Sequence, residues 1–234
     1  IGAKNVHAVM MPYEYTSEIS LTDSELQAQS QSVEYSNIDI HSMVDSFNSS
    51  LSDLFENTEI DTTEENLQSR IRGTLLMALS NKYHKIVLAT GNKSEMAVGY
   101  ATLYGDMCGG FAPLKDISKT MVYRLSKYRN TLSEVIPSRV ITRPPSAELA
   151  PNQVDQDSLP SYDILDDILT QFVEKKQSVE SIIANGHHPH DVNKITSLIL
   201  RNEYKRRQSA PGPKVSNNAF GKERRYPMTS KFKP

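Results

Sequence analysis

Two carboxylates in a glycine-rich stretch are the first candidates for chemistry in this sequence. Glu95 and Asp106 lie in LATGNKSEMAVGYATLYGDMCGGFAPLKDISKT, residues 88–120. Carboxylate oxygens are ligands that a hard divalent cation such as Mg²⁺ prefers. On one ideal helix this spacing puts both side chains on nearly the same face but about 16 Å apart. They can share one ion only if the helix breaks, and we expect that break at Gly105.

Two other interpretations of this pair stay open on spacing alone. Glu95 and Asp106 can each hold a separate ion along a polyphosphate. Alternatively, neither binds metal: Glu95 then faces the N-terminal dipole of a helix, and Asp106 only forms a turn.

The residues around Glu95 predict how it is positioned. The apolar run at 86–89 predicts a buried strand, and Thr90-Gly91-Asn92 predicts the turn that leaves it. Ser94 is placed to cap the helix that follows. Open α/β sheets bind their ligands at the carboxyl ends of strands, so we expect Glu95 at a ligand site.

Strands and helices are predicted to alternate along the chain. Further strands are predicted at 6–11 and 33–40 and a third at 86–90, with helices between them, whereas the chain is mostly helical after Ser118. Such alternation is typical of an α/β fold, in which helices cover both faces of a parallel sheet. We therefore expect this fold class, followed by a helical C-terminal part.

Composition excludes several classes of protein. The chain has 234 residues, 38% hydrophobic and 23% charged, and no apolar run approaches the roughly 18 residues that span a membrane. We therefore expect no association with a membrane. The single cysteine, Cys108, excludes an intramolecular disulfide and favours a reducing cytoplasm. No activating neighbour is evident beside it, so we expect no catalytic nucleophile.

Charge is unevenly spread along the chain. Residues 201–234 carry ten lysines or arginines against two acids, a net charge of +8, whereas the first 200 residues carry −10. A basic end suits nucleic acid, a phosphate-rich ligand or an acidic neighbouring subunit. Because residues 208–234 are rich in proline, glycine and asparagine, we expect one domain at 1–207 followed by an irregular basic tail.

Other charged residues on predicted helices are weaker candidates. Arg70, four positions after Asn66, shares its face, whereas Arg72 points elsewhere. Lys119 begins another helix, where it can hold a phosphate; solvated charges are the alternative for all three cations. The sequence contains no GxGxxG, GxxxxGK[ST] or HExxH. Their absence disfavours dinucleotide oxidoreductases, P-loop NTPases and zincins.

Five blocks stand in order along the chain. They are ENLQSRIRGTLLMALSN, TGNKSEMAVGYATLYGDMCGGFAPLKDISKT, PPSAELAPNQVDQDSLPSYDILDDIL, EYKRRQSAPGPKVS and FGKERRYPMT. Together they resemble the ligase domain of the glutamine-dependent NAD(+) synthetases. The resemblance implies a Rossmann-like fold of the adenine nucleotide alpha hydrolase type. It also implies that ATP adenylates deamido-NAD, that pyrophosphate leaves, and that ammonia then forms the amide of NAD.

The resemblance implies roles for residues on the ATP side of the site. Thr90 would contact ATP, and Lys119 and Ser146 would hold its phosphates. Some relatives carry threonine in place of Ser146, which keeps the hydroxyl. Glu95 and Asp106 would be ligands of Mg²⁺.

The resemblance also implies contacts to deamido-NAD. Asn66, Glu95 and Lys205 would bind this substrate, and Arg70 and Arg72 match the family helix as candidate phosphate contacts. For Lys205 a second interpretation stays open, because a lysine near a helix C-terminus also stabilises the helix dipole.

The sequence departs from the family in one respect. Neither the signature SGGxDS nor a glutamine-cleaving amidase domain occurs in it. The SGGxDS loop holds pyrophosphate on backbone N–H groups and brings a metal-binding aspartate. Because the first predicted strand begins almost at Ile1, we expect both parts upstream, and we expect these 234 residues alone to be inactive.

Two rival functions stay open. One is another ligase of the ATP pyrophosphatase group, such as a GMP synthetase. The other is a non-catalytic fragment that only binds nucleotide or assembles with a partner. For the synthetase we expect ammonia from an amidase domain on the same chain, a cytoplasmic homo-oligomer, and no binding of nucleic acid.

Overall fold

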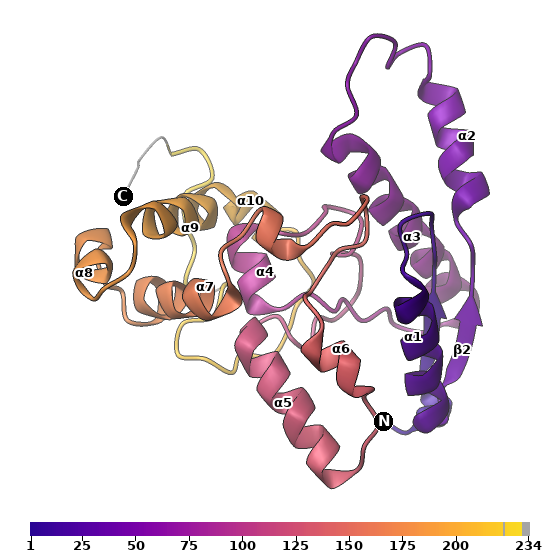
Figure 1. Ribbon diagram of the computed structural model, residues 1–234, viewed down its shortest axis with the longest axis horizontal. Helices are drawn as coiled ribbons and strands as arrows, with labels where there is room; N and C mark the ends of the chain where they lie inside the picture. The colour runs from indigo at the N-terminus through magenta and orange to yellow at the C-terminus, as the bar shows by residue number, and fades with distance from the viewer. Residues whose placement is uncertain (222, 231–234) are drawn as a thin grey trace.

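The computed structural model describes residues 1–221 and 223–230. The elements follow in the order η1 (Ala3–Asn5), β1 (His7–Met10), α1 (Glu18–Ser30), β2 (Glu34–Asn37), α2 (His41–Leu51), α3 (Thr62–Tyr83), α4 (Lys93–Val98), α5 (Lys119–Leu132), α6 (Ser138–Thr142), η2 (Asp155–Asp157), α7 (Tyr162–Leu169), the π-helical turn η3 (Thr170–Glu174), α8 (Val179–Ala184), α9 (Pro189–Arg201) and α10 (Glu203–Arg206). Figure 1 shows α1–α3 on one side of the molecule, α7–α10 on the other, and α4 between them. Within the described residues, none of the helices is both long enough and apolar enough to span a bilayer.

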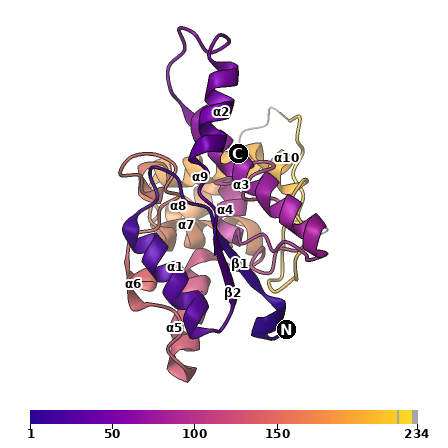
Figure 2. The ribbon, with the colours of Figure 1, turned by 90° about the vertical axis from the view of Figure 1, so that its right-hand side faces the viewer.

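The two strands form a parallel sheet. β1 and β2 pair from His7 opposite Glu34 to Met10 opposite Asn37. Helix α1 connects the strands and packs on both of them, and Figure 2 shows the strands between α1 and α3. The expected α/β class, with helices on both faces of a parallel sheet, is confirmed.

The strand predicted at 86–90 is reduced to one bridge, so this prediction was wrong. Leu88 forms an isolated parallel bridge with Phe111. The side chains of Ile86 and Leu88 are 64% and 44% exposed, although the apolar run predicted burial. A strand needs backbone partners along its length, and within the described residues this segment pairs only at the bridge.

Helix α4 is capped by a residue predicted to lie in the preceding turn, and it ends before the predicted break. Asn92, not Ser94, caps it: the Asn92 side chain accepts a hydrogen bond from the Glu95 N–H, and the Glu95 carboxylate accepts one from the Asn92 N–H. This reciprocal pair is a capping box. The helix ends at Gly99, whose φ of 74° lies in the left-handed region that favours glycine. The break between Glu95 and Asp106 therefore comes earlier than Gly105.

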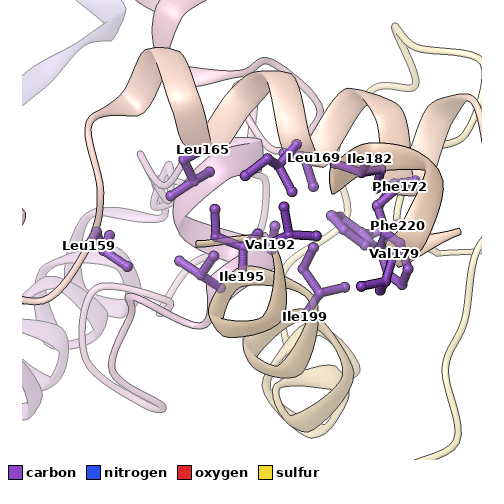
Figure 3. Close-up of a cluster of buried hydrophobic side chains, with 14 of the residues drawn as sticks. Leu159, Leu165, Leu169, Phe172, Val179, Ile182, Val192, Ile195, Ile199 and Phe220 are labelled. Carbon is purple, nitrogen blue, oxygen red and sulfur yellow. The ribbon is translucent and has the colours of Figure 1, made fainter. Parts of the chain in front are cut away.

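The largest hydrophobic core lies in the helical C-terminal part. Apolar side chains of α7, α8 and α9 interdigitate there, as Figure 3 shows, and Leu165, Ile168 and Ile195 are fully buried. Within these helices apolar residues recur every three or four positions, which gives each helix one apolar face. A second, smaller cluster of Ile40, Val44 and Ile71 joins α2 to α3. The predicted helical C-terminal part is confirmed.

The segment after α10 packs against this core. Arg206 is 6% exposed, and its guanidinium lies 4.6 Å from the ring centre of Phe220 and 5.8 Å from that of Tyr226. Arg224 lies 4.6 Å from the same Tyr226 ring. Stacking of this kind suits the planar guanidinium. Part of the basic charge near the C-terminus is therefore built into the interior.

Candidate functional site

A cavity of about 660 Å³ lies between the end of β1, α3, α4 and the loop after α6. Seven of the nine site residues predicted from the sequence line it: Asn66, Arg72, Glu95, Asp106, Lys119, Ser146 and Lys205. The other two, Thr90 and Arg70, are exposed and lie outside its wall. Arg70 instead donates from Nε to the carbonyl of Leu103 at 3.2 Å.

One face of α3 forms a wall of this cavity. The α3 residues that line it are Thr62, Glu65, Asn66, Ser69 and Arg72. The row that they form is centred on Glu65 and Ser69, and each other member lies three or four residues from one of these two. Arg72 therefore lines the cavity although its spacing from Asn66 predicts that it points elsewhere, and Arg70 does not line it although it follows Asn66 by four positions. Asn66 also accepts a hydrogen bond from the Thr102 hydroxyl at 2.8 Å.

Glu95 and Lys119 meet at the wall. The carboxylate uses one oxygen for the capping box, and its other oxygen lies 3.0 Å from the ammonium. Lys119 is the first residue of α5, and its Nζ lies 5.2 Å from the ring centre of Tyr162. Burial opposes the charged form of Lys119, but the Glu95 carboxylate outweighs it and the pKa of Lys119 is raised. The two charges stabilise each other when no ligand is bound.

Asp106 is brought to the wall by a turn that needs glycine. A Cβ on Gly105 would lie 2.2 Å from Ser69 Oγ, so this turn approaches α3 more closely than a side chain permits. The Ser69 hydroxyl accepts a hydrogen bond from the Asp106 N–H at 3.1 Å, and the Asp106 carboxylate accepts one from the Thr102 N–H at 2.6 Å.

The charge of Asp106 is costly in this position. Burial raises the pKa of its carboxyl, and the nearby Glu95 carboxylate acts in the same direction. A cation at this end of the cavity would favour the ionised form of Asp106.

The other two cations of the wall are held by backbone carbonyls. Lys205 Nζ donates to the carbonyls of Gly99 and Ala101 at 2.8 and 2.7 Å, just beyond the end of α4. Arg72 Nε donates to the Met11 carbonyl at 2.9 Å. Burial lowers the pKa of both side chains.

The loop after α6 closes another side of the cavity. Glu148 accepts hydrogen bonds from the hydroxyls of Ser17 and Ser20 at 2.7 and 2.6 Å, at the start of α1. Gln68 of α3 donates to the backbone of the same loop at 3.0 Å. Ser146, also in this loop, accepts a hydrogen bond from the Glu148 N–H at 3.0 Å. The loop is thus fastened to both helices that flank the sheet.

Three acids of the wall were missed by the sequence analysis: Glu65, Glu148 and Asp155. Asp155 is 3% exposed and accepts a hydrogen bond from the Tyr162 hydroxyl at 2.7 Å. Burial, together with this bond, raises the pKa of Tyr162. Helical spacing from Asn66 was a usable signal for Glu65. For Glu148 and Asp155 the sequence holds no local signal, because long-range contacts bring them to the cavity.

Cys108 lies outside this cavity, on the turn that follows Asp106. Its thiol donates to the Tyr104 carbonyl at 3.0 Å. Burial raises the pKa of the thiol, and the Asp106 carboxylate acts in the same direction. Both effects disfavour the reactive thiolate.

Acids outnumber bases on the cavity wall. Its five carboxylates are Glu65, Glu95, Asp106, Glu148 and Asp155, and its three cations are Arg72, Lys119 and Lys205, which leaves a formal charge of −2. A polyphosphate entering alone would meet this charge unfavourably.

The donors of the wall fit Mg²⁺, provided that a substrate completes its coordination. Within the described residues, no group of three or more His, Cys, Asp or Glu side chains comes together as a metal site. Mg²⁺ is commonly bound by one or two carboxylates with waters and substrate phosphates as the other ligands. Glu95 and Asp106 are carboxylates of that kind.

Comparison with known proteins shows the family to which this chain belongs. The sequence model of the family described as NAD synthase matches residues 1–209. The chain belongs to the NAD synthase family. The glutamine-dependent NAD(+) synthetase of Acinetobacter baylyi is 60% identical over 236 residues, covering 100% of this chain and 44% of that protein. That of Thermotoga maritima is 48% identical, covering 100% and 41%. The chain therefore spans less than half the length of these relatives.

Solved structures of NAD synthases have the same fold. The glutamine-dependent NAD+ synthetase of Acinetobacter baumannii in complex with ADP has a TM-score of 0.61 at 54% identity, over 97% of this chain and 41% of that chain. The enzyme from Cytophaga hutchinsonii has a TM-score of 0.79 at 20% identity, over 95% and 38%, which shows the fold alone. The resemblance to the ligase domain of glutamine-dependent NAD synthetases and the expected Rossmann-like fold are both confirmed.

Proposed function

We propose that this chain is the part of a glutamine-dependent NAD(+) synthetase that uses ATP to amidate deamido-NAD. The observation that carries the proposal is one cavity lined by Glu95, Asp106 and Lys119 in a member of the NAD synthase family. The ADP bound to the Acinetobacter baumannii relative supports an adenine nucleotide as one substrate.

The proposed reaction has two steps. The carboxylate of deamido-NAD is a poor acyl donor, so one of its oxygens first attacks the α-phosphorus of ATP. The bond between this phosphorus and the oxygen of the β-phosphate breaks, and pyrophosphate leaves. Ammonia then attacks the acyl carbon and its nitrogen loses a proton to solvent. The bond from the acyl carbon to the phosphate oxygen breaks, so the amide of NAD forms and AMP leaves with that oxygen. Positioning of two nucleotides and stabilisation of phosphate charge account for most of the catalysis required.

The residues of the cavity divide between the two substrates. Lys119 would leave its partner Glu95 to hold the phosphates of ATP, and the hydroxyl of Ser146 would donate to them. Asn66, Glu95 and Lys205 would contact deamido-NAD. The role of Thr90 toward ATP rests on the family resemblance alone.

Glu95 and Asp106 would hold Mg²⁺, and Arg72, which also lines the cavity, would be a phosphate contact. When bound, this ion neutralises phosphate charge. Binding would relieve the repulsion between the two carboxylates, which now contributes to the raised pKa of Asp106.

The function is tested by comparing ligands in a thermal-shift experiment on the whole enzyme. Deamido-NAD is expected to raise the melting temperature, because a ligand that binds only the folded state stabilises it. XMP, the substrate of a GMP synthetase, is the matched control and is expected to have no effect. Stabilisation by XMP alone would favour the rival ligase, and stabilisation by neither would favour a fragment that only assembles with a partner.

Lys205→Ala in the whole enzyme is expected to raise the KM for deamido-NAD roughly tenfold, the effect of losing one charge-assisted hydrogen bond. The KM for ATP should change less. The melting temperature should also fall, because two carbonyls after α4 lose their donor.

Steady-state kinetics and a thermal melt measure these changes. Lys214→Ala, which removes an exposed lysine paired with Glu223, is the control. Equal increases in KM for both substrates would show that Lys205 acts through stability alone.

Several further properties are proposed with this function. Residues 1–207 form the ligase domain, and the basic tail at 208–234 follows it, with Phe220 and Tyr226 packed in the core of that domain. A glutamine amidase domain on the same chain supplies ammonia, and the enzyme is a cytoplasmic homo-oligomer that does not bind nucleic acid.

A further inference from the structure

A buried carboxylate outside the cavity accepts hydrogen bonds from α4 and α5, the two helices that carry the Glu95–Lys119 ion pair of the cavity wall. Asp166 of α7 is 6% exposed. One of its oxygens accepts a hydrogen bond from the hydroxyl of Ser94. Its other oxygen accepts two, from the N–H of Thr120 at 2.8 Å and from the hydroxyl of Thr120 at 2.7 Å.

Ser94 closes the connection between α4 and α5. Its side chain is fully buried, and its Oγ accepts a hydrogen bond from the N–H of Lys119 at 2.9 Å. Ser94 directly precedes Glu95 in α4, and Thr120 directly follows Lys119 in α5. The hydrogen-bond partners of Asp166 are therefore adjacent in sequence to Glu95 and Lys119, which meet at the cavity wall.

These bonds resist movement of α5. The first N–H groups of a helix have no partner within it, and here those of Lys119 and Thr120 are bonded to Ser94 and Asp166. A carboxylate at this end of a helix is also favoured by the helix dipole. A shift of α5 relative to α7 would break both charge-assisted hydrogen bonds between Thr120 and Asp166.

We propose that Asp166 is a positioning residue that fixes α4 and α5 relative to each other, so that Lys119 faces Glu95 at the cavity and is directed at the phosphates of the nucleotide. The part of this inference that concerns phosphates rests on the proposed function. The placement of Lys119 opposite Glu95 does not.

The first test follows Lys119 without any substrate. In the whole enzyme, mass spectrometry measures the rate at which acetic anhydride modifies this lysine. Asp166→Asn is expected to raise that rate about tenfold, the effect of losing one charge-assisted hydrogen bond. Lys115, which donates to a backbone carbonyl elsewhere, is expected to react as before.

Two further variants control this test. Asp167→Asn changes the next carboxylate of the same helix, which faces His187, and should leave Lys119 unchanged. Thr120→Val removes one of the three bonds to Asp166 and should give a smaller increase if Asp166→Asn folds poorly. An unchanged rate at Lys119 in both Asp166→Asn and Thr120→Val would overturn the proposal, and so would a parallel increase at Lys115.

The second test is a double-mutant cycle on the dissociation constant of ATP with Mg²⁺. Asp166→Asn should weaken binding about tenfold in the wild-type background and have no further effect beside Lys119→Ala. Equal effects in both backgrounds would show that Asp166 does not act through Lys119. Failure of the wild-type enzyme to bind ATP would instead contradict the proposed function, and the acetylation rates would still decide the role of Asp166.

Discussion

In the whole enzyme, Glu95→Gln and Asp106→Asn are each expected to abolish the release of pyrophosphate from ATP in the presence of deamido-NAD. The cavity wall carries a formal charge of −2, so a triphosphate can be accepted only with cations that these two carboxylates hold. Loss of one preorganised charged group at such a site reduces the rate about 100- to 1000-fold.

Asp106→Asn should leave the fold intact. Burial raises the pKa of Asp106, so its ionised form destabilises the folded protein at neutral pH. This cost disappears as the pH falls below the ordinary carboxyl pKa of the unfolded chain, and a neutral amide removes it at any pH. Asp106→Asn should therefore melt at or above the wild-type temperature.

A coupled assay of pyrophosphate at saturating Mg²⁺ measures the loss. Asp163→Asn, an exposed carboxylate on α7, is the matched control and should keep wild-type activity. Wild-type pyrophosphate release by either cavity variant would remove that residue from the metal site.

The 234-residue chain purified by itself is expected to make no NAD. Its sequence contains no SGGxDS loop to hold the leaving pyrophosphate. Losing one donor at a developing charge already costs about 100- to 1000-fold in rate, and loss of a whole phosphate-binding loop should cost more.

The experiment supplies ATP, Mg²⁺, deamido-NAD and ammonium, so that no amidase is needed, and detects NAD by mass spectrometry. The whole enzyme, given the same ammonium, is the positive control. Turnover by the short chain at a comparable rate would show that the phosphate-binding loop is dispensable.

The sequence predicts local features of this molecule better than distant contacts. The helical spacing of the C-terminal part and the strands at β1 and β2 follow from periodicity. The apolar run at 86–89 misleads because strand formation depends on backbone partners that the run itself does not reveal. Serine suits the cap of a helix, so the sequence predicts Ser94 as the cap of α4. Its hydroxyl instead donates a hydrogen bond to Asp166 of α7.

The residues of the candidate site likewise include some that a continuous stretch of sequence predicts and others that only distant contacts bring to the cavity. Glu95, Asp106 and Lys119 lie in one continuous block, so the sequence could bring them together before the fold was known. Glu148 could not be found in this way, because its loop reaches α1 and α3 through hydrogen bonds between residues 81 to 131 positions apart. Such contacts have no local pattern.

The cavity lies between two hydrophobic clusters, and these clusters can unfold separately. The larger cluster supports α4, α7, α8 and α9, whereas the smaller one of Ile40, Val44 and Ile71 supports α3. Clusters with separate members can unfold as separate units, each with its own protection against hydrogen exchange. A nucleotide that touches both walls would link the two, because opening either unit would then also require release of the ligand. Substrate binding would thus make the unfolding of this molecule more cooperative.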